Sequence, residues 1–154
     1  MARFTLFSTL ALLMILVTWR FWPEPSEEDR VREVIRAVIA GAEAGDVGDV
    51  MSHVSERFSG DSGEGGFDKP TLRSLLTVRF LKHGPIAVFV AEILVEITGV
   101  DAHANFDALL TESTGNWTEI IPVNADGWHM EVDLSREDKG WKIVAAKRSD
   151  VRLQ

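Results

Sequence analysis

Residues 128–149, WHMEVDLSREDKGWKIVAAKRS, decide the fold of this chain. Their first half alternates apolar and polar residues, which is the period of a half-buried β-strand. REDKG then supplies a polar turn that leads into a second apolar run, and this order predicts a β-hairpin. We expect the apolar side chains of the first strand to face a core, and its polar side chains, His129, Glu131 and Asp133, to face solvent.

Further stretches ahead of this hairpin have strand-like sequences. Residues 86–98, IAVFVAEILVEIT, are rich in β-branched residues, and we place Phe89 on the inward face of a single strand there. Residues 102–111, AHANFDALLT, alternate apolar with polar residues, and WTEIIPV at 117–123 is a lesser strand candidate. The second half of the chain is therefore predicted to be a run of antiparallel strands.

Three helices are predicted ahead of these strands. Ser26 has the N-cap position of the first helix, and apolar residues recur at helical spacing until GAEAGD at 41–46 ends it. Asp46, at the end of this break, or Asp49 can cap a short second helix. Asp68 caps a third helix, which ends at His83-Gly84-Pro85. Helices packed on one face of an antiparallel sheet make an α+β domain.

Residues 58–72, FSGDSGEGGFDKPTL, combine glycines and acids, as phosphate and calcium loops do. Lys69 follows an aspartate, however, so the glycine-lysine pair of a phosphate loop is missing. Leu72 stands where the last calcium ligand of an EF-hand loop would be. We interpret this stretch as the connection between the second and third helices.

The N-terminal segment predicts a membrane anchor. Residues 4–19, FTLFSTLALLMILVTW, carry no charge, and the apolar run through Trp22 approaches the roughly 20 residues of a spanning helix. Arg3 precedes this run and several acids follow it, so the positive-inside rule predicts a cytoplasmic N terminus and an exported remainder. The small residues of a cleavage site are missing, and a cleaved, secreted or periplasmic product is the alternative. We divide the chain into a transmembrane signal-anchor at 1–22, a linker at 23–27 and a domain at 28–154.

The composition excludes several functions. The chain has no cysteine, so it can form neither a disulfide nor a thiolate zinc site. Its 16 lysines and arginines stand against 24 acids, a net charge of −8 that disfavours nucleic acid as a partner. No motif indicates a cofactor or a metal site.

The order of these elements is similar to that of a known superfamily. A capped helix, AEAGDVGDVMSHVSERF at 42–58, a third helix and long strands ending in REDKGWKIVAAKRS at 136–149 resemble the NTF2-like proteins, also called SnoaL-like or ketosteroid-isomerase-like. The AGD break after the first helix and the acidic turn before GWKIV are the most telling pieces. Residues 57–83 are similar to bacterial membrane-anchored or exported members of unassigned function.

The resemblance implies a cone, in which a strongly curved sheet wraps three N-terminal helices and leaves a pocket at the open end. The connection at 58–72 would then lie near the mouth of the cone. Members include enzymes, transport adaptors and dimerisation modules, so the fold alone does not assign an activity. The resemblance also favours a bacterial inner-membrane protein with a single span and a periplasmic C-terminal domain.

Catalytic candidates are few. Ketosteroid isomerase chemistry uses a tyrosine and two aspartic acids, and this chain has no tyrosine. Asp107, His129 and Asp133 are the candidates that are left, but each falls on the polar face of its strand. If the two strands pair, these residues form a polar ladder with His103 and Glu131, which is either a solvated face or a zinc or acid–base site.

Two functions follow from this pattern. The aromatic residues available to line a pocket are Phe89, Phe106, Trp117, Trp128 and Trp141, although a core or an interface would use the same residue types. The first function is a membrane-tethered binding module for a small ligand or a partner protein, or a homodimer through the sheet. The alternative is a small-molecule isomerase, dehydratase or hydrolase, which requires a carboxylate or histidine facing into the pocket.

Overall fold

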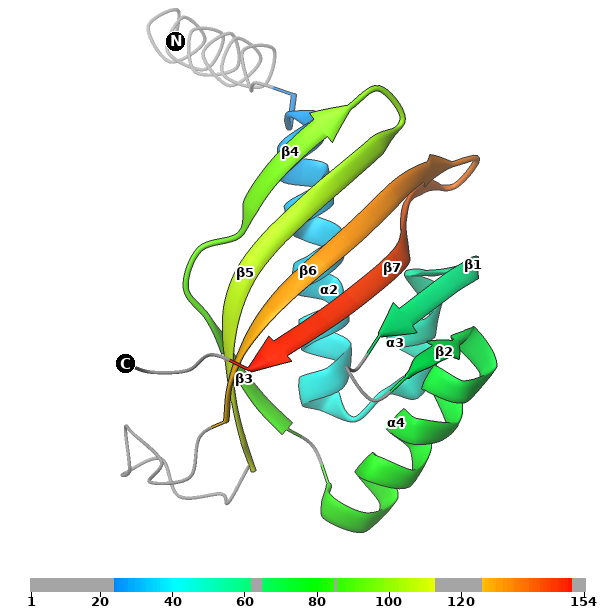
Figure 1. Ribbon diagram of the computed structural model, residues 1–154, viewed down its shortest axis with the longest axis vertical. Helices are drawn as coiled ribbons and strands as arrows, with labels where there is room; N and C mark the ends of the chain where they lie inside the picture. The colour runs from blue at the N-terminus through cyan, green and yellow to red at the C-terminus, as the bar shows by residue number, and fades with distance from the viewer. Residues whose placement is uncertain (1–23, 62–64, 85, 113–125, 151–154) are drawn as a thin grey trace, which may run out of the picture.

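The computed structural model describes residues 24–61, 65–84, 86–112 and 126–150 (Figure 1). The helices are α2 (Glu27–Ala44), α3 (Val47–Ser52) and α4 (Lys69–His83). The strands are β1 (Val54–Asp61), β2 (Gly66–Asp68), β3 (Ile86–Val90), β4 (Leu94–Thr98), β5 (Asp101–Glu112), β6 (Asp126–Glu137) and β7 (Gly140–Asp150). No helix within the described ranges is long and apolar enough to cross a membrane. The predicted anchor at 1–22 and the strand candidate at 117–123 lie outside those ranges.

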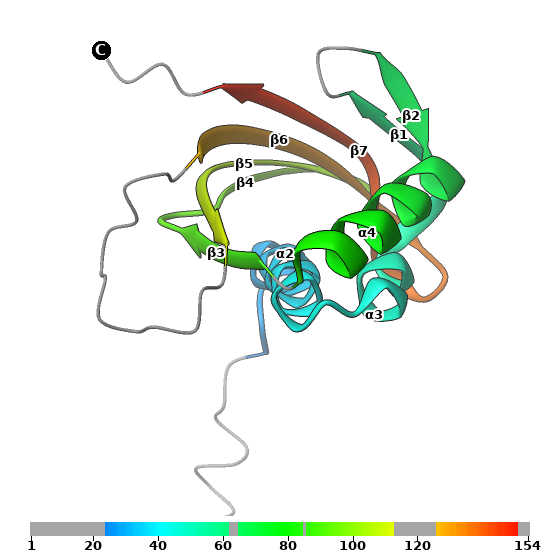
Figure 2. The ribbon, with the colours of Figure 1, turned by 90° about the horizontal axis from the view of Figure 1, so that it is seen from below.

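The described strands form one curved sheet. Its order is β2-β1-β7-β6-β5-β3. β3 pairs with the second half of β5, and β4 pairs with the first half. Neighbouring strands are antiparallel except for β1 and β7, which are parallel. Figure 2 shows the sheet arching over the helices, with α2 and α4 beneath its concave face. The predicted hairpin at 128–149 is confirmed as β6 and β7.

Helix α2 lies against the concave face of the sheet and has well-formed ends. The Ser26 hydroxyl accepts a hydrogen bond from the Asp29 N–H at 3.2 Å, and the Asp29 carboxylate accepts one from the Ser26 N–H at 3.3 Å. Gly45 ends the helix in the left-handed conformation, with φ at 69°. Val31 and Ile35 are 0% and 2% exposed and belong to the core. The apolar face predicted from helical spacing is therefore the face that packs.

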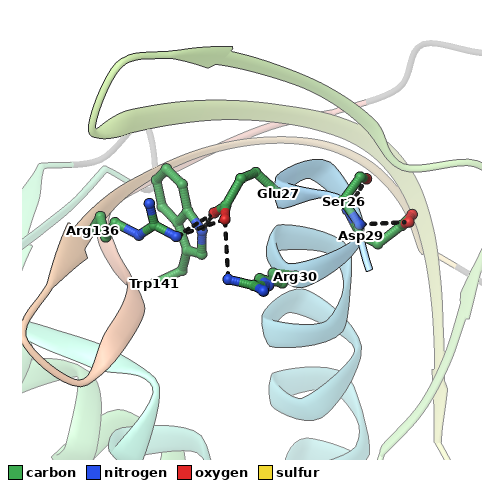
Figure 3. A network of polar contacts seen from close by, with 6 residues as sticks. All are labelled: Ser26, Glu27, Asp29, Arg30, Arg136 and Trp141. Carbon is green, nitrogen blue, oxygen red and sulfur yellow. Dashed lines mark hydrogen bonds and ion pairs between the residues drawn. The ribbon is translucent and has the colours of Figure 1, made fainter. Parts of the chain in front are cut away.

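A cluster around Glu27 fastens the start of α2 to the β6–β7 hairpin (Figure 3). Arg136 Nη2 donates to both carboxylate oxygens of Glu27 at 2.7 Å, and Arg30 Nη1 donates to one of them at 3.1 Å. The buried indole of Trp141 donates through Nε1 at 2.9 Å. The indole hydrogen bond, together with the two guanidinium groups, holds the pKa of Glu27 below its usual value. The carboxylate therefore stays charged and keeps the helix and the hairpin joined.

The segment at 58–72 differs from the sequence interpretation. Most of its described part belongs to a hairpin of β1 and β2, with Gly60 paired to Phe67, rather than to a plain connection between helices. β1 also pairs in parallel with β7, whereas the sequence predicted an antiparallel sheet throughout. The burial pattern along β1 does not alternate strictly, and its register with β7 shifts between Val54 and Ser59. A strand without alternation gives no period-two signal.

The segment at 86–98 also differs, because it forms two strands where one was predicted. Val88 and Val90 of β3 pack against the core, as do Val95 and Ile97 of β4, so the inward phase changes by one residue between the strands. A change of one residue exchanges the two faces of a strand. Phe89, which the sequence placed inward, is 60% exposed and pairs with Leu109 of β5.

The β1–β2 hairpin predicts a stability difference between two glycines. A Cβ added at Gly60 would overlap the ring of Phe67, whereas one added at Gly66 would lie 3.6 Å from the Gly60 carbonyl oxygen, an ordinary contact. We expect Gly60→Ala to lower the free energy of unfolding by about 1–3 kcal/mol, because the ring must move in a packed site. Gly66→Ala is the matched control, since it makes the same chemical change without the overlap. Equal urea midpoints for the two variants would contradict the close approach of Gly60 and Phe67.

Candidate functional site

A cavity of about 410 Å³ lies between the concave face of the sheet and helices α2 and α4. This volume falls within the range of roughly 300–1,000 Å³ that small-molecule sites occupy. The apolar lining comes from both helices, from α3 and from five strands: Ile35, Val38, Ile39, Ala42, Val50, Val54, Phe58, Phe67, Leu72, Leu76, Phe106, Trp128, Met130, Val132, Ile143 and Ala146. The fold therefore encloses a mostly apolar cavity, and α4 alone covers one side of it.

The cavity exists because α4 packs loosely. None of the residues of α4 is buried, and Leu72 and Leu76, which pack against the core, are only partly buried. On the sheet side, the small side chain of Ala146 stands opposite Val132. A large residue at position 146 would fill the space that the alanine leaves open.

A β-bulge determines which residues of β7 face the cavity. The β6–β7 register shifts between Leu134 and Asp133, because Leu134 pairs with Ile143 but Asp133 pairs with Ala145. One extra residue in a strand exchanges its two faces beyond that point. Ala146 and Arg148 consequently lie on the cavity side after the bulge, with Arg148 opposite Met130.

The charged residues of the lining are Asp61, Lys147 and Arg148, and we call them the charged rim. They are exposed or half-buried, so they lie at the opening of the cavity. The Arg148 guanidinium lies 4.4 Å from the ring centroid of Trp128, which is a cation–π contact. The Lys147 ammonium instead lies 3.9 Å from Glu131 on the outer face of the sheet.

A second cavity, of about 500 Å³, lies between α2 and the β3–β4 segment. Its lining contains the charged side chains Arg32, Arg36, Glu43 and Glu92. Arg32 Nε donates to the Ile93 carbonyl at 3.2 Å, and the Glu43 carboxylate accepts from the Val88 N–H at 3.1 Å. Two of its four charged groups thus serve to hold the helix against the sheet.

The polar ladder predicted on β5 and β6 forms on the outer face. His103 Nδ1 lies 2.6 Å from an Asp133 oxygen, and His129 Nδ1 lies 2.7 Å from an Asp107 oxygen. The four side chains are between 40% and 69% exposed. The hydrogen bond that Asp133 accepts from His103 is the main cause that raises the pKa of His103 above its usual value. In the part of the chain that the structure describes, no three ligating side chains are grouped as a metal site would need.

Solved structures share this architecture at low sequence identity. A Streptomyces avermitilis protein described as a "putative dehydratase from the NTF2-like family" matches with a TM-score of 0.69 and 16% identity, over 81% of this chain and 96% of its own. An NTF2-like protein with a cystatin-like fold from Novosphingobium aromaticivorans matches with a TM-score of 0.68 and 15% identity, over 96% and 91%. The fold is NTF2-like.

Other comparisons add no activity. A Pseudomonas putida NTF2-like protein of unknown function matches with a TM-score of 0.65 and 14% identity, over 77% of this chain and 82% of its own. No protein-family model matches the sequence, and no curated protein matches it. The predicted α+β class with a curved sheet is confirmed, and at these identities the NTF2-like neighbours inform on the fold alone.

The NTF2-like domain separates the predicted site residues into groups. The catalytic candidates Asp107, His129 and Asp133 lie on the outer face of the sheet, away from the cavity. Of the five aromatic pocket candidates, Phe106 and Trp128 line the cavity. The other three lie elsewhere: Phe89 is exposed, Trp141 is buried against Glu27, and Trp117 is outside the described residues.

The sequence did not predict that residues of the helices line the cavity, and it did not predict the charged rim. Val38, Ile39, Leu72 and Leu76 carried the signal of an apolar helical stripe, but such a stripe marks core and cavity residues alike. Arg148 had no usable signal, because its orientation depends on the bulge in the NTF2-like sheet.

The pairing of His103 with Asp133 on the outer face predicts a pH-dependent contribution to the stability of the fold. Because the folded-state pKa of His103 is raised, its pairing with Asp133 stabilises the fold fully below the unfolded-state pKa, and this stabilisation is lost as pH rises through the folded-state pKa. We expect Asp133→Asn to reduce the free energy of unfolding more at about pH 5.5 than at about pH 8.5. Asp138→Asn, in the exposed turn after β6, is the control. An NMR titration of His103 that is the same in wild type and Asp133→Asn would contradict the pairing.

Proposed function

We propose that this chain is a binding module that holds a small apolar molecule in the cavity beneath its sheet. The observation that carries the proposal is the lining, in which sixteen apolar residues surround the space and the charged residues are confined to the rim. Apolar cavities with few polar groups at defined positions are typical of small-molecule sites.

The positions of the ionisable groups support binding rather than catalysis. An isomerase, dehydratase or hydrolase would need an acid–base group directed at the bound molecule. Asp107, His129 and Asp133 are on the far side of the sheet, and Asp61 at the rim is the one carboxylate among the described lining residues. The Streptomyces protein is described as a putative dehydratase, but its sequence is only 16% identical to this chain. Enzymatic activity is therefore the second candidate.

The binding function predicts that substitution of two neighbouring alanines of β7 affects ligand affinity to different extents. Ala146 lines the cavity, whereas Ala145 pairs with Asp133 on the outer face. We expect Ala146→Phe to weaken binding of a neutral apolar probe such as decanol at least tenfold, because the new ring occupies the space. Ala145→Phe should change the affinity less than twofold. Isothermal titration calorimetry measures both values, and circular dichroism checks that both variants are folded.

Each result decides the proposal. Weaker binding in Ala146→Phe alone supports a ligand site in this cavity. Equal affinities in the two variants, or no binding of the probe to the wild type, would contradict it.

We further propose that residues 1–22 anchor the module in a bacterial inner membrane with the domain in the periplasm. The uncharged stretch at 4–19, the arginine before it and the acids after it support this orientation. Ser26 and Glu27, which begin α2, follow within a few residues, so the domain would stand close to the membrane surface.

The anchor predicts how the full-length chain fractionates. Expressed in a bacterial host, it should stay with the inner membrane after an alkaline carbonate wash, because a spanning helix is held by its apolar surface. Protease added to spheroplasts should digest the domain. N-terminal sequencing distinguishes the alternatives, since a mature chain that begins after residue 22 would mean cleavage and release. A full-length chain in the soluble fraction would contradict the anchor.

A further inference from the structure

We propose that the ligand of this cavity is a singly charged anionic amphiphile, a carboxylate on an apolar chain, and that Arg148 binds its head group against Trp128. This inference rests on the proposed binding function, and it specifies the ligand class for the same cavity. It follows from the position of Arg148 in the charged rim of a cavity whose other lining residues are apolar.

The sheet directs Arg148 toward the opening by two features. The β-bulge between Leu134 and Asp133 places Arg148 on the cavity face, opposite Met130 and diagonal to Trp128. The guanidinium carbon then lies over the Trp128 ring, 4.4 Å from its centroid. A cation–π contact does not use up the five N–H donors that a guanidinium carries. Those N–H groups match the two oxygens of a carboxylate.

Arg148 is the cation of the rim that is available for a ligand. Among the described residues no carboxylate forms an ion pair with it, whereas the Lys147 ammonium lies 3.9 Å from Glu131. Arg136, by comparison, forms an ion pair with Glu27 at the start of α2. A bound carboxylate would thus meet a guanidinium that has no ion-pair partner among the described residues, at the point where the cavity meets solvent.

The charge of the surroundings limits the head group to one negative charge. Asp61 belongs to the same rim, and the chain as a whole carries a net charge of −8. A dianion such as a phosphate monoester would meet repulsion that a single guanidinium does not offset. A carboxylate has one charge and the geometry that a guanidinium binds through two hydrogen bonds.

The interior of the cavity requires the remainder of the ligand to be apolar. Ile35, Val50, Val54 and Phe58, which form its inner wall, are between 2% and 5% exposed. A second polar group on the ligand would lose its water there without gaining a hydrogen bond. The head group therefore lies at the rim and the chain extends beneath the sheet.

Three probes of equal chain length test this assignment: decanoate, decanol and decylamine, each below its aggregation concentration. Calorimetry on the full-length protein in detergent-free nanodiscs gives the affinities, with empty nanodiscs as the blank. We expect decanoate to bind at least tenfold more tightly than decanol, and decylamine to bind most weakly, because one charge-assisted pair contributes on this scale. The preference for decanoate should decrease as salt is raised, since the rim is exposed.

Binding inside the cavity is read from methionine methyl groups. Met130 lines the cavity and should shift in ¹³C-methyl spectra on addition of decanoate, whereas Met51, 2% exposed in the core, is the internal reference. A Met130→Leu variant assigns the signal. Binding of decanoate without a shift of Met130 would place it outside the cavity and overturn the inference. If decanol also binds without a shift of Met130, the proposed function is overturned as well.

Substitutions at the rim separate the head-group contact from general attraction. Arg148→Met should weaken decanoate about tenfold or more and leave decanol within twofold, and Arg148→Lys should be intermediate. Lys139→Met is the control, because it removes the same charge from the exposed turn between β6 and β7, outside the cavity lining, and should change decanoate binding less than twofold. If Arg148→Met fails to fold, Arg148→Lys and the salt series on the wild type carry the test.

The outcomes distinguish the two proposals. Equal affinity for decanoate and decanol, unchanged in the Arg148 variants, overturns the inference and leaves the apolar binding site standing. An equal loss in Lys139→Met and Arg148→Met also overturns it, since the attraction would then be nonspecific. If no probe binds, the proposed function itself is overturned.

Discussion

The packing of α2 against the concave face of the sheet is the contact on which the rest of the structure depends. Val31 of the helix and Leu134 of the sheet are fully buried, so the two layers are sealed where they meet. The charged cluster around Glu27 fixes the first turn of the helix to the β6–β7 hairpin. With one helix held in this way, the curvature of the sheet leaves a space that α4 covers incompletely. The cavity is therefore a consequence of how the core is sealed at one side and open at the other.

Much of the fold could be predicted because its elements carry local signals. The capped helix at Ser26 and the alternating strands β5 and β6 each show their period within a few residues. β1 could not be predicted in the same way, because its burial does not alternate and its neighbour β7 is remote in sequence. The division of 86–98 into β3 and β4 was missed because no glycine or proline marks the change of phase at residues 91–93.

The site was less predictable than the fold, for a physical reason. Alternation tells which face of a strand is inward, and by that measure Phe106, Trp128 and Trp141 are equivalent. Whether an inward residue meets a core or a cavity depends on which helix stands opposite it, and that is a tertiary property. Trp141 meets Glu27 at the start of α2, whereas Trp128 meets open space beside Arg148. The orientation of Arg148 depends in turn on a single extra residue in β7.

The parallel pairing of β1 with β7 constrains when this domain can fold. Val54 pairs with Ile143, and Asp61 pairs with Lys147. β1, from the first half of the chain, can therefore complete its pairing only after β7 has been synthesised. Contacts between such distant positions slow folding, because a long loop must close before the pairing is gained. If the domain is exported to the periplasm in an unfolded state, the sheet is completed only after β7 has crossed the membrane. The domain would then be exposed to proteases and chaperones of the destination compartment throughout its transit.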